Sequence, residues 1–261
     1  ALLLAVSEGR SWGWASGRTL GLFVAAAVLA AAWVRIEDRS ATPLVDMRMM
    51  RLRGVWTTNV ATVLIGFGMF SSFILVPQLV EMPASTGWGL GASVTEAGLY
   101  LVPSTLAMLL MGPVTGRIAT ALGSKVPLVA GAAVCAVSFA LLAFAHREPW
   151  EVYLGTALMG VGIGLAFASM ANLIVEAVPR EQTGVASGMN TIMRSIGSSL
   201  GSQISASIIA GTVVASTGLP GESGFTAAFA LCAGVLVVGT VAALGVPGQA
   251  ARARQTAAAS A

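Results

Sequence analysis

Long apolar runs separated by short polar stretches dominate this chain of 261 residues. After a shorter apolar start, seven runs cover residues 17–35, 55–77, 94–116, 126–145, 152–175, 185–213 and 225–246. A helix rises about 1.5 Å per residue, so most of these runs reach across the roughly 30 Å of hydrocarbon in a bilayer. The pattern therefore predicts an all-α protein, a polytopic bundle of membrane-spanning helices.

The sixth run differs from the others because small and polar residues recur along one of its sides. A rotation of 100° per residue about a helix axis brings nine of them together. This polar stripe consists of Ser187, Asn190, Thr191, Arg194, Ser195, Ser198, Gly201, Ser202 and Ser205. The other side holds Met189, Ile192, Met193, Ile196, Leu200 and Ile204, with Gln203 as a polar exception.

Because the neighbouring runs are apolar, we expect the polar stripe to face the inside of the bundle. A charged side chain at the centre of a bilayer costs about 2.5 kcal/mol or more, so such groups usually line a hydrated cavity or pair with each other. The stripe thus predicts a solute pathway that includes Arg194. In the alternative interpretation, Arg194 snorkels to the headgroups and the serines only permit close helix packing.

The composition supports an integral membrane protein, since 56% of the residues are hydrophobic and 10% are charged. The formal net charge of +3 says little, because the placement of basic residues matters more than their sum. Cys135 and Cys232 both fall within apolar runs, which argues against a disulfide framework or a metal site. We expect no cofactor, no metal and no nucleic-acid partner.

Basic residues concentrate in every second connection between the runs, and this asymmetry predicts the orientation. One set of connections holds Arg35, Arg39, Arg48, Arg51, Arg53, Arg117, Lys125, Arg180, Arg252 and Arg254. The alternate set holds only Arg10, Arg18 and Arg147. Cytoplasmic loops of membrane proteins are the ones enriched in Lys and Arg. The first set and the C-terminus are therefore expected in the cytoplasm.

The runs also suggest a division of the chain into four parts. Residues 1–16 look like the end of a truncated span followed by an outer loop, and residues 17–53 like a linker helix followed by a cytoplasmic linker. Within that linker, residues 43–53 alternate apolar and basic residues, as in a short interfacial helix. Residues 54–246 form six spans and residues 247–261 a cytoplasmic tail. The sixth run is expected to begin at Pro179, with Pro in the first helical position.

Glycines recur at a spacing that permits close helix packing, and two of the repeats imitate enzyme motifs. The pairs are Gly112 with Gly116, Gly160 with Gly164, and Gly197 with Gly201. Residues 197–201 fit the G-x-S-x-G string, but a nucleophile elbow needs a preceding strand, and the single histidine, His146, lies on the opposite face. Residues 160–164 lack the strand of a nucleotide loop. We therefore expect a non-enzyme; a membrane-embedded enzyme and a non-transporting membrane scaffold stay open as alternatives.

Residues 99–125, which read LYLVPSTLAMLLMGPVTGRIATALGSK, closely resemble a helix and its cytoplasmic loop in the major facilitator superfamily, in the fourteen-span drug:proton antiporter branch. Residues 4–14 resemble the outer loop between the two extra central helices of that branch. Residues 43–48 resemble the link into its C-terminal half, and residues 178–201 the entry to its penultimate helix. The resemblance covers essentially the whole chain. It implies the C-terminal six-helix half of a major facilitator fold, preceded by a linker helix.

The resemblance also implies a function. It suggests part of a bacterial inner-membrane exporter of drugs or antibiotics, driven by inward proton flow. Two six-helix halves would rock about a site at the midplane, giving access to either side in turn. The implied partners are membrane lipid, the missing N-terminal half, a small amphiphilic substrate and protons. An uptake or metabolite carrier of the same superfamily is the alternative transporter.

Helix geometry selects candidates for the pathway, and the resemblance selects those for the loop motif. The pathway candidates are Asn59, Thr62, Tyr100, Met108, Asn172, Asn190, Arg194 and Ser198. The loop-motif residues are Gly116, Arg117, Gly123 and Lys125; Thr120 stands where the family pattern commonly has an acid, and it cannot form a charge relay. Glu96 is a candidate for proton coupling, although Ser93 and Glu96 also fit a helix-capping box.

Overall fold

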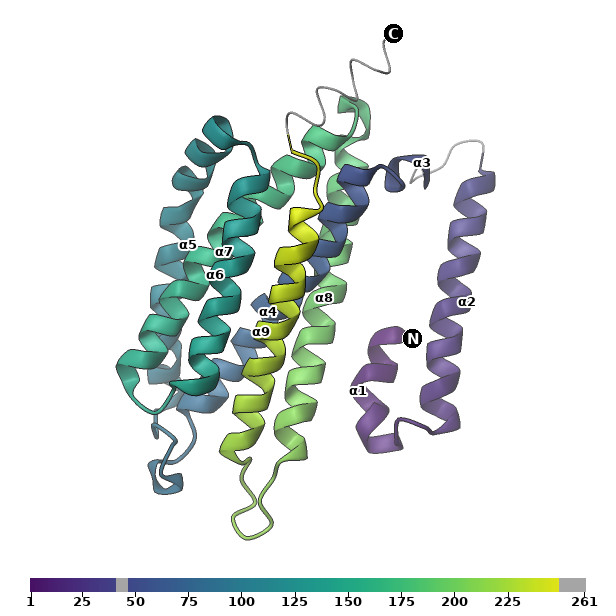
Figure 1. Cartoon of the computed structure of the whole chain (residues 1–261). Helices are drawn as coiled ribbons and strands as arrows, with labels where there is room; N and C mark the ends of the chain where they lie inside the picture. The colour runs from purple at the N-terminus through teal and green to yellow at the C-terminus, as the bar shows by residue number, and fades with distance from the viewer. Residues whose placement is uncertain (41–46, 249–261) are drawn as a thin grey trace.

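The computed structural model describes residues 1–40 and 47–248 as a set of helices (Figure 1). They are α1 (Leu2–Trp12), α2 (Gly17–Arg39), α3 (Met47–Met50), α4 (Arg53–Val80), α5 (Val94–Leu122), α6 (Lys125–Phe144), α7 (Pro149–Ala177), α8 (Thr183–Gly211) and α9 (Glu222–Leu244), with the 3-10 turns η1 (Ala84–Thr86) and η2 (Arg180–Gln182). Within these residues the only extended pairing is an isolated bridge between Val213 and Pro220. The all-α prediction is confirmed.

Six of the described helices are long and apolar enough to cross a membrane: α2, α4, α5, α6, α7 and α9. Each coincides with one of the predicted runs. The remaining run, the sixth, forms α8, which has 29 residues and therefore the required length, but it does not reach the hydropathy of the other six. Its polar stripe is the cause, because serines and asparagine replace apolar residues on one side.

Three predicted boundaries need correction. The sixth run does not begin at Pro179: residues 180–182 form the 3-10 turn η2, and α8 starts at Thr183. Helix α1 continues to Trp12, so the first loop is shorter than expected. Of the interfacial helix expected over residues 43–53, Met47–Met50 form a single turn and Arg53 already opens α4, while residues 43–46 lie outside the described part of the chain.

Helices α4 to α9 form one bundle, and α1 and α2 stand beside it (Figure 1). Helix α4 packs against α8 and α9, α7 packs against α5 and α6, and α6 packs against α9. Helix α1 contacts α2 and α8. The ends of the bundle are named here by their residues: His146 and Glu222 lie at the 146/222 end, at the bottom of Figure 1, and Ser124 and Arg180 lie at the 124/180 end.

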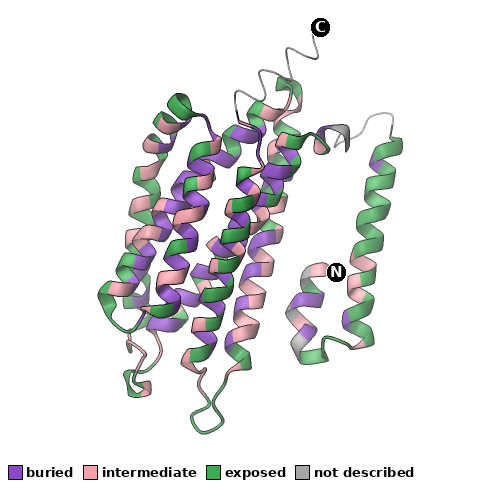
Figure 2. Ribbon diagram, viewed as in Figure 1, coloured by how far each residue is buried: buried purple, intermediate pink, exposed green. Residues whose placement is uncertain are grey.

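Buried residues gather on the sides of the helices that face the inside of the bundle, as the ribbon colours of Figure 2 show. The largest include Phe139, Phe225 and Phe229, which join α6 to α9. In contrast, only 6% of the apolar segment of α2 and 11% of that of α5 are buried inside the described chain. Both helices therefore present apolar surface that a bilayer or another protein segment can cover.

Two of the three predicted glycine pairs lie where helices approach most closely. A Cβ atom on Gly160 would collide with the backbone of Ser104, and one on Gly164 would lie 2.7 Å from the Met111 Cβ. Gly197 and Gly201 meet the carbonyl oxygens of α4 residues. Gly112 and Gly116 differ, since both are exposed and have no other group within 4 Å of an added Cβ in the described chain. The first two pairs thus allow α5 to touch α7 and α4 to touch α8.

Candidate substrate site

A close contact between two helix backbones fixes the polar stripe of α8 against α4. Gly197 and Gly201 would each clash with a backbone carbonyl of α4, those of Val63 and Phe67, if they carried a Cβ. From the other side, a Cβ on Gly66 would lie 2.8 Å from the carbonyl oxygen of Arg194. Because the two backbones touch, α8 cannot rotate about its axis without a clash. The directions of Asn190 and Arg194 are set by this contact.

A buried hydrogen-bond network joins the two helices one turn closer to the 124/180 end. The Asn190 Nδ2 donates to the Asn59 Oδ1 at 2.9 Å and to the Thr62 Oγ1 at 2.8 Å. The Thr62 hydroxyl in turn donates to the Thr58 carbonyl oxygen at 2.8 Å. Asn190, Asn59 and Thr62 are 6%, 4% and 0% exposed. Among the described residues, the buried Asn59 Nδ2 has no acceptor.

Beside this network lies a pocket of about 260 Å³ between α7 and α8. It is lined by Phe167, Ala171, Ile174, Ser187, Asn190, Thr191 and Arg194. The Arg194 guanidinium carbon stands 4.5 Å from the centroid of the Phe167 ring, in the range of a cation–π contact. In the described part of the chain, no carboxylate forms an ion pair with Arg194. The pocket therefore combines an apolar wall, amide and hydroxyl groups, and one unneutralised cation.

The polar stripe is split by this packing. Asn190, Gly197 and Gly201, called here the packed edge, are buried, and the two glycines meet the α4 backbone directly. Thr191 and Ser195 are exposed and Arg194 is partly buried, and these three form the open edge. Ser198 is buried, and its hydroxyl donates to the Arg194 carbonyl oxygen at 2.7 Å. Only part of the stripe is thus available to a solute.

The hydroxyl groups of the stripe are mostly satisfied by their own helix. Thr191 donates to the Ser187 carbonyl oxygen at 3.1 Å, and Ser195 donates to that of Thr191 at 3.0 Å. Such bonds to a carbonyl one turn earlier let serine and threonine sit in an apolar environment without another partner. The open edge is therefore compatible with lipid, with a protein partner or with water, and Arg194 is its distinctive chemical group.

The structure brings four of the eight pathway candidates together: Asn59, Thr62, Asn190 and Arg194. Ser198 lies one turn from Arg194 on α8 and bonds to its carbonyl oxygen, but it does not line the pocket. The other three candidates lie elsewhere. Tyr100 is buried and stacks on Tyr153, with ring centroids 4.5 Å apart. Met108 is 43% exposed on α5, and Asn172 is exposed on α7 outside the pocket lining.

The apolar wall of the pocket was not among the predicted residues. Phe167, Ala171 and Ile174 are spaced at i, i+4 and i+7, so they share one side of α7. The prediction selected Asn172 by helix geometry, and this residue lies next to the apolar side of α7 rather than on it. A search for helical spacing around each aromatic residue could have found the wall, but without saying which of several apolar sides faces α8.

Glu96 caps helix α5. The Ser93 backbone nitrogen donates to the Glu96 Oε2 at 2.8 Å, and the Glu96 nitrogen donates to the Ser93 Oγ at 3.3 Å. This reciprocal pair is a capping box, as the sequence predicted. Glu96 is exposed, and proton coupling through it stays a prediction.

The loop-motif residues tie helix ends together at the 124/180 end. Gly123 has a φ of +88°, which suits glycine, and it makes the turn between α5 and α6. Lys125 then donates from Nζ to the Leu244 carbonyl oxygen at 2.7 Å, which joins α6 to the end of α9. Thr120 donates to the Arg117 carbonyl oxygen at 2.9 Å. Gly116 and Arg117 are exposed.

Comparison with known proteins agrees with the helical architecture. A sequence model described as the Major Facilitator Superfamily matches residues 1–202 and also residues 90–260. A protein named multidrug resistance protein Stp, from Mycobacterium tuberculosis, is 31% identical over 197 residues, which cover 75% of this chain and 35% of that protein.

Two Streptomyces proteins are also similar. The tetracenomycin C resistance and export protein of Streptomyces glaucescens is 30% identical over 72% of this chain and 34% of its own length. A tetracycline resistance determinant of Streptomyces rimosus is 26% identical over 72% of this chain and 53% of its length. The chain thus spans a third to a half of the length of these relatives.

Proposed function

Because the chain belongs to the Major Facilitator Superfamily, we propose that it forms part of a bacterial exporter of small amphiphilic compounds such as drugs or antibiotics. In this proposal, α4 to α9 are one six-helix half of the transporter and α2 is a linker helix. A second six-helix half completes the pathway, and the relatives are long enough to contain one. The named resistance and export proteins among the relatives support the class of substrate.

The observation that carries the proposal is the pocket between α7 and α8. Its apolar wall of Phe167, Ala171 and Ile174 suits a hydrophobic ring system, and Arg194 suits an acidic or hydrogen-bond-accepting group on the same compound. Asn190, held by Asn59 and Thr62, offers a rigidly placed amide beside them. An amphiphilic compound satisfies both kinds of surface, whereas a purely polar solute leaves the apolar wall uncovered.

The expected mode of action is alternating access, driven by protons that enter from outside. The contacts within the half are tight at α4 with α8 and at α5 with α7, so the half is expected to move as one body against its counterpart. In this proposal the 124/180 end faces the cytoplasm, and the basic residues Arg117, Lys125 and Arg180 at that end support this orientation. The 146/222 end then faces outward.

Transport by the product of the complete gene, reconstituted in proteoliposomes, tests the proposal. An imposed proton gradient should drive accumulation of a fluorescent amphiphilic drug, and Arg194→Gln should lower the initial rate about tenfold, equivalent to about 1.4 kcal/mol. Arg18→Gln, which removes an exposed cation on α2, serves as the control with an unchanged rate. An Arg194→Gln protein of normal abundance and normal rate would remove Arg194 from the pathway.

Residues 1–261 reconstituted alone provide a second arm of the same experiment. We expect no vectorial uptake, because one six-helix half encloses only one side of a pathway. Uptake by the isolated chain would contradict the assignment of these helices to half of a transporter.

A further inference from the structure

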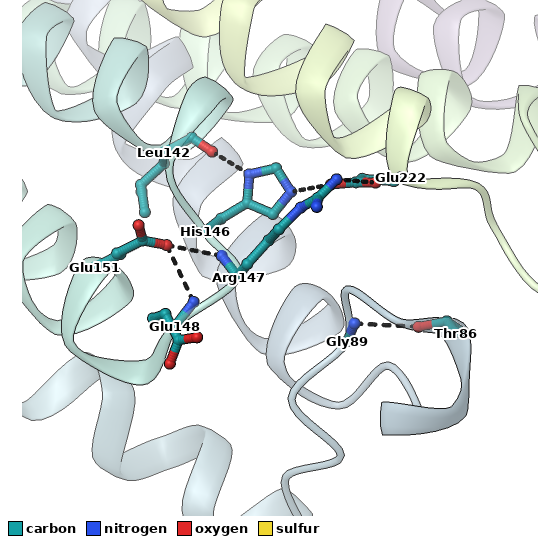
Figure 3. Close-up of polar contacts among 8 residues, drawn as sticks. All are labelled: Thr86, Gly89, Leu142, His146, Arg147, Glu148, Glu151 and Glu222. Atoms are coloured by element: carbon teal, nitrogen blue, oxygen red, sulfur yellow. Dashed lines mark hydrogen bonds and ion pairs between the residues drawn. The ribbon is translucent and has the colours of Figure 1, made fainter.

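A second polar cluster lies at the 146/222 end, where α6 ends and α9 begins (Figure 3). His146 follows the last turn of α6 and is only 3% exposed, and it is the single histidine of the sequence. Glu222 is the first residue of α9, and its side chain is 28% exposed. The ring of Phe229, from the same helix, lies 6.4 Å from the imidazole and shields it.

The hydrogen bonds of His146 determine which ring nitrogen carries the proton. The His146 Nδ1 lies 2.7 Å from the Leu142 carbonyl oxygen, and a carbonyl only accepts, so Nδ1 must be the donor. In a neutral imidazole, Nε2 then carries only a lone pair. It lies 3.4 Å from the Glu222 Oε1, which is also an acceptor. Within the described residues this buried Nε2 has no hydrogen-bond partner.

We propose that His146 Nε2 and the Glu222 carboxylate form a proton-binding site that clamps the end of α6 to the start of α9. A proton from bulk water adds to Nε2, and the neutral imidazole becomes an imidazolium whose N–H faces the carboxylate. The contact between two acceptors becomes an ion pair. Glu222 is the partly exposed member of the pair, so it offers the proton a route from water to the buried ring.

Other charged groups lie around the pair. The Arg147 guanidinium already holds Glu222, with Nε 3.0 Å from Oε1 and Nη2 3.2 Å from Oε2. From α7, Glu151 accepts the backbone N–H groups of Arg147 and Glu148, at 2.8 Å and 3.0 Å. Three carboxylates and one guanidinium leave the cluster with a net negative charge. Glu81, on the loop between α4 and α5, forms no ion pair with it in the described chain.

The clamp holds two elements that are distant in sequence. Beside the apolar packing of α6 on α9, which includes Phe139 against Phe229, the contact of residues 146 and 147 with Glu222 adds a polar link between the hairpin of α6 and α7 and the start of α9. Its place on the outer side, where a proton-driven exporter takes up protons, rests on the proposed function. The two atoms form the site whichever way the chain is oriented.

A direct test uses the single histidine. The purified chain, carrying ¹³C at His Cε1 and held in lipid nanodiscs, gives one imidazole resonance, which we follow between pH 5 and pH 8. Glu222→Gln should lower the ratio of imidazolium to imidazole at pH 6.5 about tenfold, because an opposite charge in contact is lost. Arg147→Gln should raise that ratio, because it removes the competing cation. A general change in folding would not be expected to lower the imidazolium ratio in one variant and raise it in the other.

Thermal unfolding supplies a second measurement. At pH 5.5 the Tm of the wild type should be several degrees higher than that of His146→Gln. At pH 8 the two Tm values should be the same. If Glu222→Gln does not fold, Glu222→Asp, which retracts the carboxylate, should shift the ratio in the same direction by a smaller factor. A resonance that does not move with pH, or that titrates identically in wild type and the Glu222 variant, overturns the site. Absent drug transport with a titrating His146 would instead refute the exporter.

Discussion

The two edges of α8 carry similar small polar residues but have different environments. The packed edge of Asn190, Gly197 and Gly201 touches the α4 backbone, whereas Thr191 and Ser195 of the open edge are exposed. Serine and threonine hydroxyls bond to their own helix on either side, so they do not distinguish the edges. The edges differ in two other respects. The packed edge has two residues without a Cβ, Gly197 and Gly201, and the open edge has the cation of Arg194. Polar residues along a membrane helix therefore indicate a side that does not simply face lipid, and glycines indicate which part of that side packs against another helix.

The largest expected effect comes from one substitution made at two glycines of α8. Gly197→Ala places a methyl group against the Val63 carbonyl, which belongs to a helix backbone and cannot move aside, so we expect a loss of about 3 kcal/mol in the free energy of unfolding. Gly188→Ala adds the same methyl group where no group from another part of the described chain lies within 4 Å, and it should stabilise α8 by about 0.5–1 kcal/mol.

Reversible unfolding of the purified chain in mixed micelles measures both changes. Equal effects of the same sign at positions 188 and 197 would show that α8 is not packed on α4 through the edge assigned here.

A smaller effect is expected from the polar network beneath the packed edge. Asn190→Ala removes two hydrogen bonds and leaves the buried Asn59 amide and Thr62 hydroxyl without that partner, which should cost about 2 kcal/mol. Asn172→Ala, a matched change at an exposed position on α7, should alter stability by less than about 0.5 kcal/mol. Similar losses in the two variants would argue that the network is not formed in the membrane.

The sequence predicts the helices well because a membrane span needs a continuous apolar run. Every predicted run became a helix, and the boundary at Pro179 failed because a 3-10 turn and a helix start share the same residue preferences. The short helix predicted after residue 43 rested on an alternation of apolar and basic residues too brief to fix a helix.

The candidate site was predicted only where a helix has two unlike sides. The polar stripe indicated which side of α8 faces the bundle, and Asn59 and Thr62 indicated the same for α4. The hydrogen bonds of these two residues with Asn190 agree with both orientations. Helices α5 and α7 have no polar stripe like that of α8, and apolar residues on most sides of a helix do not show which side faces a neighbour. Helix geometry selected Tyr100, Met108 and Asn172 on those helices, and none of them lines the pocket.

The most direct test of the account is the reactivity of cysteines placed on α8 in the membrane. Cys135 and Cys232 can stay, since they are 2% and 0% exposed and should not react. In the product of the complete gene, Thr191→Cys on the open edge should react with a membrane-impermeant thiol reagent at least about tenfold faster than Ala186→Cys, whose position is 0% exposed. Equal rates at the two positions, or no reaction at position 191, would contradict a hydrated open edge beside Arg194.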